Sequence, residues 1–286
     1  MNRKDLTLNI RGTLMDFEVP KVMAIVNITP DSFYSSGRSF DEGSIRKRIY
    51  QITEERADII DVGGCSTRPG SSSVEIEEEY SRLARALEVI RGTASDAVVS
   101  VDTWRAEIAL KCVEEWDVDI INDISGGSMD PEIWDVVAEK KVGYVLTHSR
   151  GTPENMSTLA SYEDVTAEVV TELSKKLYLL RQKKINDIII DPGFGFAKTP
   201  SQSLRLLDEL NELCRFGLPV MAALSRKSMI WKTLDLNPEE SYEGTIALDA
   251  IALDRGADIL RVHDVKAAVR TVRLLTEMKG KCRYSE

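Results

Sequence analysis

About eight short apolar runs alternate with longer segments of helical periodicity along the 286 residues of this chain. Strands that are apolar over nearly their whole length are typical of a parallel sheet covered by helices, and eight β-α units are the number that closes a (β/α)8 TIM barrel. We therefore predict an α/β fold in which residues 1–286 form a single TIM-barrel domain and not two doubly wound ones. The expected strands are "VMAIVNI", "ADIIDVGG", "AVVSVDT", "VDIINDIS", "GYVLTHS", "DIIIDPG", "PVMAALS" and "ADILRVHD".

A separate segment precedes the first of these strands. "LTLNIRGTLMDF" alternates apolar and polar residues around Gly12, a pattern that predicts a β-hairpin. We expect this N-terminal hairpin, within residues 1–21, to cap the bottom of the barrel.

The acidic composition excludes one class of partner. The chain has 37 Lys and Arg against 47 Asp and Glu, a net charge of -10, whereas nucleic acids are bound by clustered cations. No apolar run reaches the roughly 20 residues needed to cross a bilayer, so we expect no nucleic-acid or membrane partner.

The cysteines form no CxxC pair and no signal-like stretch opens the chain, which predicts a reduced, cytoplasmic protein without structural zinc. They are Cys65, Cys112, Cys214 and Cys282.

Polar side chains gather in the last residues of the expected strands. In barrel enzymes the carboxyl ends of the strands and the loops after them build the active site, so this pattern indicates catalysis. A lone Asp there often caps the next helix or bonds to loop N–H groups, an alternative that stays open for Asp123 and Asp264. His148 alone fits a structural histidine. The polar set is Asn27, Asp61, Asp102, Asn122, Asp123, His148, Asp191, Ser225, Arg226, Lys227, Arg261 and His263.

Within this set, carboxylates and an amide stand beside cations. Asp102, Asn122 and Asp191 are costly to bury unless they are paired, and they fit a flat heterocycle with N–H donors along one edge, such as a pterin. Lys227 is expected to donate to the carbonyl oxygen of that ring, and Ser228 to begin a helix whose first N–H groups attract an anion. Together with Arg68, Arg226 and Arg261, Lys227 makes four cations at one rim. The residues alone therefore indicate an enzyme that joins a polar heterocycle to an anion.

Three loops are longer and richer in small residues than a β-α turn requires. They follow the first, second and sixth strands as "NITPDSFYSSGRSF", "GGCSTRPGSSS" and "DPGFGFAKTP". Loops of this kind often close over a site. Asn27, at the start of the first, has a carbonyl oxygen that suits Mg²⁺ held mainly by phosphates and water.

The motifs "NITPDSF", "GGCSTRPG", "SVDT", "NDISGG", "IDPGFGFAK", "SRKSMI" and "RVHDV" occur in order along nearly the whole chain. In these motifs the chain resembles the dihydropteroate synthase family. The resemblance implies a (β/α)8 barrel that condenses 6-hydroxymethyl-7,8-dihydropterin pyrophosphate with 4-aminobenzoate, giving 7,8-dihydropteroate and pyrophosphate by an SN1-like route. It also implies Mg²⁺, a homodimer, a place in folate biosynthesis and a target of sulfonamides.

The same resemblance assigns roles to residues at matching positions. It implies that the pterin is bound by Asp102, Asn122, Asp191, Lys227 and Arg261. Asn27, Arg261 and His263 would bind the pyrophosphate, with Asn27 also near the metal. The residues that would receive aminobenzoate are Phe33, Thr67, Arg68, Pro69, Phe196 and Ser228. The catalytic roles would fall to Asp102, Asp191, Lys227 and Arg68.

The chain departs from the common family pattern at four positions. Cys65 stands where many relatives have Glu, and Ser35 replaces a carboxylate in the first loop. Arg150 lies in "THSRG" where "MHMQG" is familiar, and Ala197 lies in "FGFAK" where "FGFGK" is familiar. None of the four removes a residue expected to bind the pterin.

Two other functions remain alternatives. One is a methyltetrahydrofolate-dependent methyltransferase with a related pterin site, which would not need "TPDSF", "STRPG" or "SRKSMI". The other is a catalytically silent pterin-binding protein, which loss of Asn27, Arg68 or Lys227 would favour, and all three residues are present.

Overall fold

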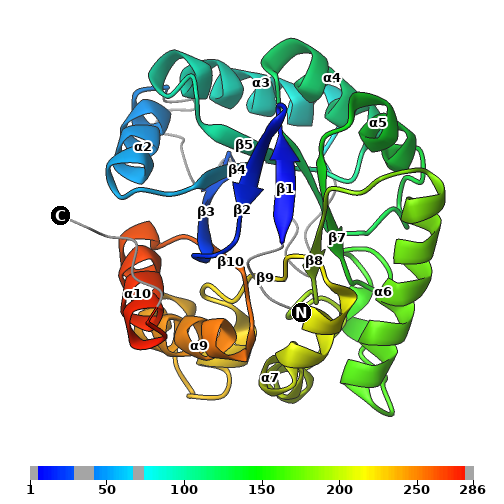
Figure 1. Ribbon diagram of the computed structural model, residues 1–286, viewed down its shortest axis with the longest axis vertical. Helices are drawn as coiled ribbons and strands as arrows, with labels where there is room; N and C mark the ends of the chain where they lie inside the picture. Colours follow the sequence, from blue (N-terminus) through cyan, green and yellow to red (C-terminus); the bar gives the residue numbers. More distant parts are fainter. Residues whose placement is uncertain (1–5, 29–41, 67–73, 281–286) are drawn as a thin grey trace.

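The computed structural model describes residues 6–28, 42–66 and 74–280 (Figure 1). Its main sheet has eight parallel strands in the order β8-β7-β6-β5-β4-β3-β10-β9. A parallel bridge between Ile190 and Val220 brings the two ends of this order together, so the predicted (β/α)8 barrel is confirmed. The eight strands are β3 (Lys21–Asn27), β4 (Ile59–Gly63), β5 (Val98–Asp102), β6 (Ile120–Asp123), β7 (Gly143–Thr147), β8 (Ile188–Asp191), β9 (Met221–Ala222) and β10 (Ile259–Val262).

Helices between the strands form an outer ring around the sheet (Figure 1). The helix α7 shows how the sequence fixes a helix start, since Thr199 and Gln202 form a reciprocal capping box and Pro200 occupies the first turn. The α-helices are α2 (Glu42–Glu54), α3 (Ile76–Thr93), α4 (Ala106–Trp116), α5 (Ile133–Lys140), α6 (Val165–Gln182), α7 (Pro200–Asp208), α8 (Ser228–Trp231), α9 (Tyr242–Arg255) and α10 (Val265–Met278). Short 3-10 helices are η2 (Met156–Thr158), η3 (Leu210–Phe216) and η4 (Pro238–Glu240).

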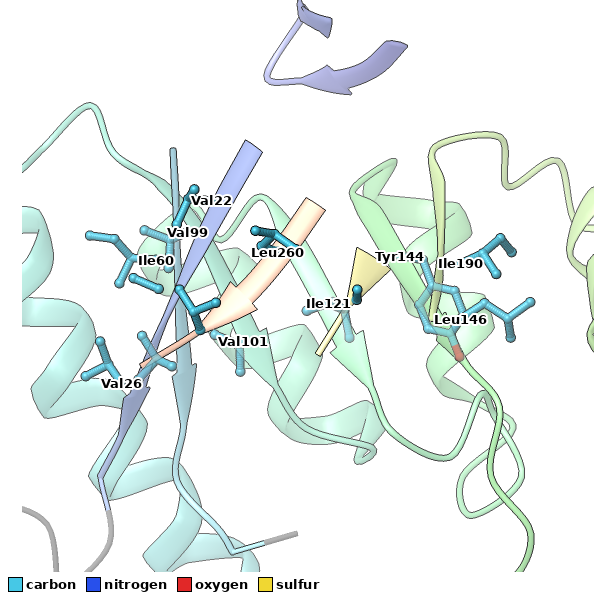
Figure 2. Packing of buried hydrophobic residues seen from close by; sticks show 14 of the residues in the cluster. Val22, Val26, Ile60, Val99, Val101, Ile121, Tyr144, Leu146, Ile190 and Leu260 are labelled. Atoms are coloured by element: carbon cyan, nitrogen blue, oxygen red, sulfur yellow. The ribbon is translucent and has the colours of Figure 1, made fainter. Parts of the chain in front are cut away.

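The main hydrophobic core lies between the sheet and the helices. Outward-facing strand residues and the buried faces of the helices form it, and Figure 2 shows members on neighbouring strands, among them Val22, Ile60 and Val99. Burial of apolar surface contributes roughly 25 cal/mol per Å², so this layer supplies most of the driving force for folding. In the described residues no helix is both long and apolar enough to cross a membrane.

The predicted N-terminal hairpin is confirmed, and it closes the bottom of the barrel. β1 (Thr7–Ile10) and β2 (Thr13–Asp16) pair in antiparallel register and lie across the centre of the ring (Figure 1). Arg11 Nε is 2.8 Å from Asp119 Oδ1 in an ion pair that ties the hairpin to the β5–β6 end of the barrel. A second hydrophobic cluster fills the space between them: Leu8, Ile10, Phe17, Met23, Ile59, Ile120, Val145, Ile189, Met221 and Ile259.

The seventh barrel strand is shorter than its apolar run suggests. "PVMAALS" contributes only the two residues of β9. Pro219 has no N–H to donate to a ladder, and the Val220 N–H donates to the Asp258 side chain at 3.0 Å instead of to a neighbouring strand. The Pro219 carbonyl still accepts from the Ile190 N–H at 2.8 Å. The join between β8 and β9 is therefore the most weakly paired part of the ring.

Candidate functional site

The candidate site lies at the carboxyl end of the barrel, where inward-facing positions change from apolar to polar. Successive side chains of a strand point to opposite faces, so the residue two places after an inward apolar side chain also faces the interior. Asp61, Asn122, Asp191 and Arg261 each follow by two places an isoleucine of the bottom cluster. Asp102 lies opposite Asn122 in the β5–β6 register. The strand period thus brings most of the expected pterin residues to one level of the barrel.

Arg261 holds two carboxylates together at this level. Its Nε donates to Asp61 Oδ2 at 2.7 Å, and its Nη2 donates to Asp102 Oδ2 at 2.7 Å. Asn122 Nδ2 donates to the same Asp61 oxygen at 3.1 Å. Because the Asn122 amide donates to Asp61, its carbonyl oxygen is the group left to accept from a ligand.

Burial shapes the charges of this cluster. It raises the pKa of Asp102, and the Arg261 cation opposes that shift. For Arg261, burial by itself would lower the pKa, but the carboxylates of Asp61 and Asp102 outweigh it and raise the pKa. Asp102 Oδ1 is buried and has no hydrogen-bond partner among the described residues. An unpaired buried acceptor is unfavourable until a donor reaches it, so this oxygen is suited to an N–H group of a ligand.

A second group of side chains comes from the segments after β8 and β9. Asp191 Oδ1 accepts from the Gly193 N–H at 2.7 Å, and burial raises the pKa of Asp191. Lys227 Nζ donates to the Phe194 carbonyl and lies 4.7 Å from the centroid of the Phe196 ring. Burial lowers the pKa of Lys227 to about 8, and Asp191 opposes that shift. Lys227 and Phe196, expected at different substrates, are therefore neighbours.

Asn27 ends β3, and His263 directly follows β10, the strand that pairs with β3. A Cβ at Gly63 would lie 3.3 Å from Asn27 Oδ1 and 3.6 Å from Asp102 Cβ, so this glycine leaves room for both side chains. His263 Nδ1 is 3.0 Å from Ser225 Oγ. Burial and, after it, the nearby Arg261 cation together lower the pKa of His263 to about 4, so the imidazole is neutral near pH 7.

Some expected residues have other partners or lie outside the described parts of the chain. Arg226 has a φ of 56° and forms an ion pair with Asp264 at 2.9 Å, so it does not contribute a free cation to the rim as the sequence suggested. Asp123 accepts from the Ser125 and Gly127 N–H groups, both at 2.7 Å, which confirms its structural alternative. Ser228 begins α8 as expected, but that helix has only four residues. Phe33, Thr67, Arg68 and Pro69 lie outside the described residues.

Comparison with known proteins places the chain in a family. Residues 23–263 match the family model for pterin binding enzymes. The chain belongs to the pterin binding enzyme family. It is 41% identical over 274 residues to the dihydropteroate synthase of Synechocystis sp., covering 93% of each chain. The resemblance stated from the sequence motifs is thereby confirmed.

Two further relatives in the pterin binding enzyme family differ in activity, as their names state. The inactive dihydropteroate synthase 2 of Mycobacterium leprae is 36% identical over 267 residues, which is 91% of this chain and 90% of that protein. The solved structure of Xanthomonas albilineans dihydropteroate synthase with 4-aminobenzoic acid has a TM-score of 0.87 and 34% identity, and covers 96% of this chain and 98% of that one. Because the relatives include a protein named inactive, family membership alone does not establish activity, and the residues of the site must be considered.

Asp61 is the residue of this pterin binding enzyme whose role the sequence left unassigned. It is fully buried and accepts from both Arg261 and Asn122. Asp61 therefore orients Arg261 and Asn122, two side chains that are expected to contact the pterin. No contact between Asp61 and the pterin is expected. Its only sequence signal is its place at the same strand level as Asp102 and Asn122.

We expect Asp61→Asn to weaken pterin binding by about tenfold, because the neutral amide removes the negative charge that pairs with Arg261 and so weakens the hydrogen bonds that orient Arg261 and Asn122. Isothermal titration with a pterin measures this directly. Thr53→Ala, on the outer helix α2, removes a hydroxyl that donates to the Ile49 carbonyl at 2.9 Å and serves as the control. Equal pterin affinity in wild type and Asp61→Asn would rule out the orienting role.

Proposed function

We propose that this chain is a dihydropteroate synthase of folate biosynthesis, which condenses 6-hydroxymethyl-7,8-dihydropterin pyrophosphate with 4-aminobenzoate. The observation that carries this proposal is the convergence of Asp102, Asn122, Asp191 and Lys227 with Arg261 at the barrel mouth. The named relatives and the neighbour solved with 4-aminobenzoic acid support it.

The polar groups at the mouth match the edge of a pterin ring. The Asn122 carbonyl oxygen and the carboxylates of Asp102 and Asp191 are acceptors for its amino and ring N–H groups. Lys227 is the donor for its carbonyl oxygen, since an ammonium group has three N–H donors and the hydrogen bond to the Phe194 carbonyl uses one of them. Buried acceptors of this kind discriminate strongly against rings without the matching donors.

The same carboxylates act on the reaction. In an SN1-like route the pyrophosphate leaves first, and positive charge spreads from the exocyclic methylene into the pterin ring. Asp102 and Asp191 are fixed before the reaction, so they stabilise this charge without reorganisation. The amine of 4-aminobenzoate then attacks the methylene carbon and loses a proton, giving 7,8-dihydropteroate.

The leaving pyrophosphate is assigned to Asn27, Arg261 and His263. Neutral His263 is a donor through one ring nitrogen, and Arg261 supplies charge. The donor set also fits Mg²⁺, because Asn27 presents a hard oxygen beside Gly63 while the described residues contain no group of three or more His, Cys, Asp or Glu that could hold a metal. Such a site requires the phosphates and water to supply most ligands. When bound, the cation offsets charge that develops on the leaving group.

The 4-aminobenzoate site is assigned to Phe196 and Ser228 together with Phe33, Thr67, Arg68 and Pro69 of the first two loops. Phe196 lies against Lys227, and this contact supports adjoining sites for 4-aminobenzoate and the pterin. Closure of the loops would exclude water, which competes with the amine for the electrophilic methylene. A homodimer and a cytoplasmic location are also part of the proposal; sedimentation velocity of the purified chain tests the dimer.

The deciding experiment measures pyrophosphate release from the dihydropterin pyrophosphate, with and without Mg²⁺ and with and without 4-aminobenzoate. Release that requires both, with formation of dihydropteroate, supports the synthase. Tight pterin binding without release supports a silent barrel, and methyl transfer from methyltetrahydrofolate without release supports the methyltransferase. Either of the last two results contradicts the proposal.

A further inference from the structure

A buried lysine joins the two loops that follow β7 and β8. Lys198 is 7% exposed, and its Nζ lies 2.8 Å from His148 Nδ1, 3.1 Å from the Gly193 carbonyl and 3.2 Å from the Phe196 carbonyl. An ammonium group has three N–H donors, so these acceptors can use all of them. Burial lowers the pKa of Lys198 to about 7, and Asp191 opposes that shift.

His148 continues the connection to α6. Its Nε2 lies 3.0 Å from Glu172 Oε2. Burial and, after it, the Lys198 charge lower the pKa of His148 to about 4. A neutral imidazole satisfies both neighbours when Nε2 donates to Glu172 and Nδ1 accepts from Lys198. Arg150 pairs with the same glutamate and lies 3.9 Å from the centroid of the Tyr162 ring. The unusual arginine of "THSRG" is thus bound to α6 and its neighbours.

The loop held by Lys198 forms one wall of the candidate site. The N–H of Gly193 donates to Asp191, and the carbonyl of Phe194 accepts from Lys227. A Cβ at Gly193, where φ is +68°, would lie 1.9 Å from the His148 carbonyl oxygen, so the two loops touch through their backbones. The position of the 193–196 loop therefore affects how the side chains of Asp191 and Lys227 are oriented, and it determines where Phe196 lies.

We propose that Lys198 is a positioning residue that, with His148, locks the 193–196 loop against the end of β7 and so fixes the wall shared by the two substrates. The inference rests on the proposed function and adds a residue to it. Lys198 acts through Asp191, Lys227 and Phe196 and not through contact with a substrate.

The test compares Lys198→Met with Lys176→Met in the full-length chain. Lys176 is a matched control, since its Nζ also binds a loop carbonyl, that of Ser125, at 2.9 Å, together with Ser128 Oγ at 2.8 Å. Lys198→Met removes the donor to Gly193 and Phe196. Amide exchange within residues 193–196 is expected to become about tenfold faster or more, because local opening loses the contribution of a charge-assisted hydrogen bond. Lys176→Met is expected to leave this exchange unchanged.

Kinetics give the second measurement. Lys198→Met is expected to raise the KM for 4-aminobenzoate, through Phe196, and to lower kcat/KM on the order of 100-fold, since small misplacements of reacting groups have effects of that size. A lysine needed only for stability would lower the melting temperature and leave both KM values unchanged well below it. That result, or unaltered exchange in the 193–196 loop, would overturn the proposal.

A second variant and the exchange measurement test the role of Lys198 even if Lys198→Met does not fold or the wild type is inactive. If Lys198→Met does not fold, His148→Phe removes the Nδ1 acceptor while keeping a ring of similar size, and the same increase in loop exchange is expected. If the wild type forms no dihydropteroate, the proposed function fails, while the exchange comparison still decides whether Lys198 locks the loop.

Discussion

Asp102→Asn is expected to lower kcat for dihydropteroate formation by about 100- to 1000-fold, the range seen when one fixed electrostatic group is removed from a transition state. Asp102 supplies a buried carboxylate whose Oδ1 has no partner within the described parts of the chain. The amide that replaces it has the same shape but no charge to stabilise the developing cation. Steady-state assays with both substrates at saturation measure the change.

The stability of this variant should change much less than its activity. Burial raises the pKa of Asp102, which means that the charged carboxylate makes the folded state less stable as pH rises through that pKa. An amide avoids that charge, and Arg261 keeps Asp61 as a partner. Ser100→Ala on the same strand is the control, because its hydroxyl is buried without a hydrogen-bond partner in the described structure. Full activity in Asp102→Asn would contradict its assignment.

The raised pKa of Asp102 also predicts the acid side of the pH profile. The reaction requires the ionised form, so wild-type kcat/KM should fall with decreasing pH well above the ordinary Asp value of about 4. Asp102→Asn should lack this step in the profile. Protonation of Asp102 is therefore expected to lower activity and to increase the stability of the folded state.

Phe17→Ala is expected to lower the free energy of unfolding by about 3–5 kcal/mol, as large truncations in a core do. Phe17 follows β2, is 0% exposed and packs in the cluster that fills the bottom of the barrel. Urea unfolding measures the loss. Leu14→Ala in the same hairpin is the control, because Leu14 is 66% exposed and surface substitutions usually change stability within about 0.5 kcal/mol.

The site at the opposite end should be unaffected by this truncation. At a temperature where Phe17→Ala remains folded, its KM for both substrates should equal that of the wild type. A small loss of stability would show that the hairpin is only loosely packed against the barrel. A large change in KM would show that the two ends of the barrel are coupled.

The sequence predicted the barrel and much of its mouth because strand geometry is local. A period of two residues directs Asp102, Asn122 and Asp191 inward wherever the strand runs. An isoleucine two places earlier marks this direction for Asn122 and Asp191. The same reasoning identified Arg261. The short β9 was not predictable in this way, because its length depends on whether Val220 donates to a strand or to Asp258.

Contacts between side chains that are far apart in the chain could not be predicted from the sequence. Neighbouring Arg226 and Lys227 look equivalent in "SRKSMI", yet the left-handed backbone at Arg226 accompanies its pairing with Asp264, and Lys227 faces the site. Lys198 and His148 are 50 residues apart and meet only because β7 and β8 are adjacent. Pairings of this kind follow from the assembled ring and not from any local pattern.

Because β8 and β9 are weakly paired, a substrate that contacts both sides of this join is expected to stabilise the barrel. Asp191 ends β8, and Lys227 lies a few residues beyond β9, so the two side chains stand on opposite sides of the join. In the proposed site, a pterin bonded to both would span the place where the ring closes through the bridge between Ile190 and Val220. Under the proposed function, bound ligand would act as a removable cross-link, and we expect the melting temperature of the barrel to rise with the occupancy of the site.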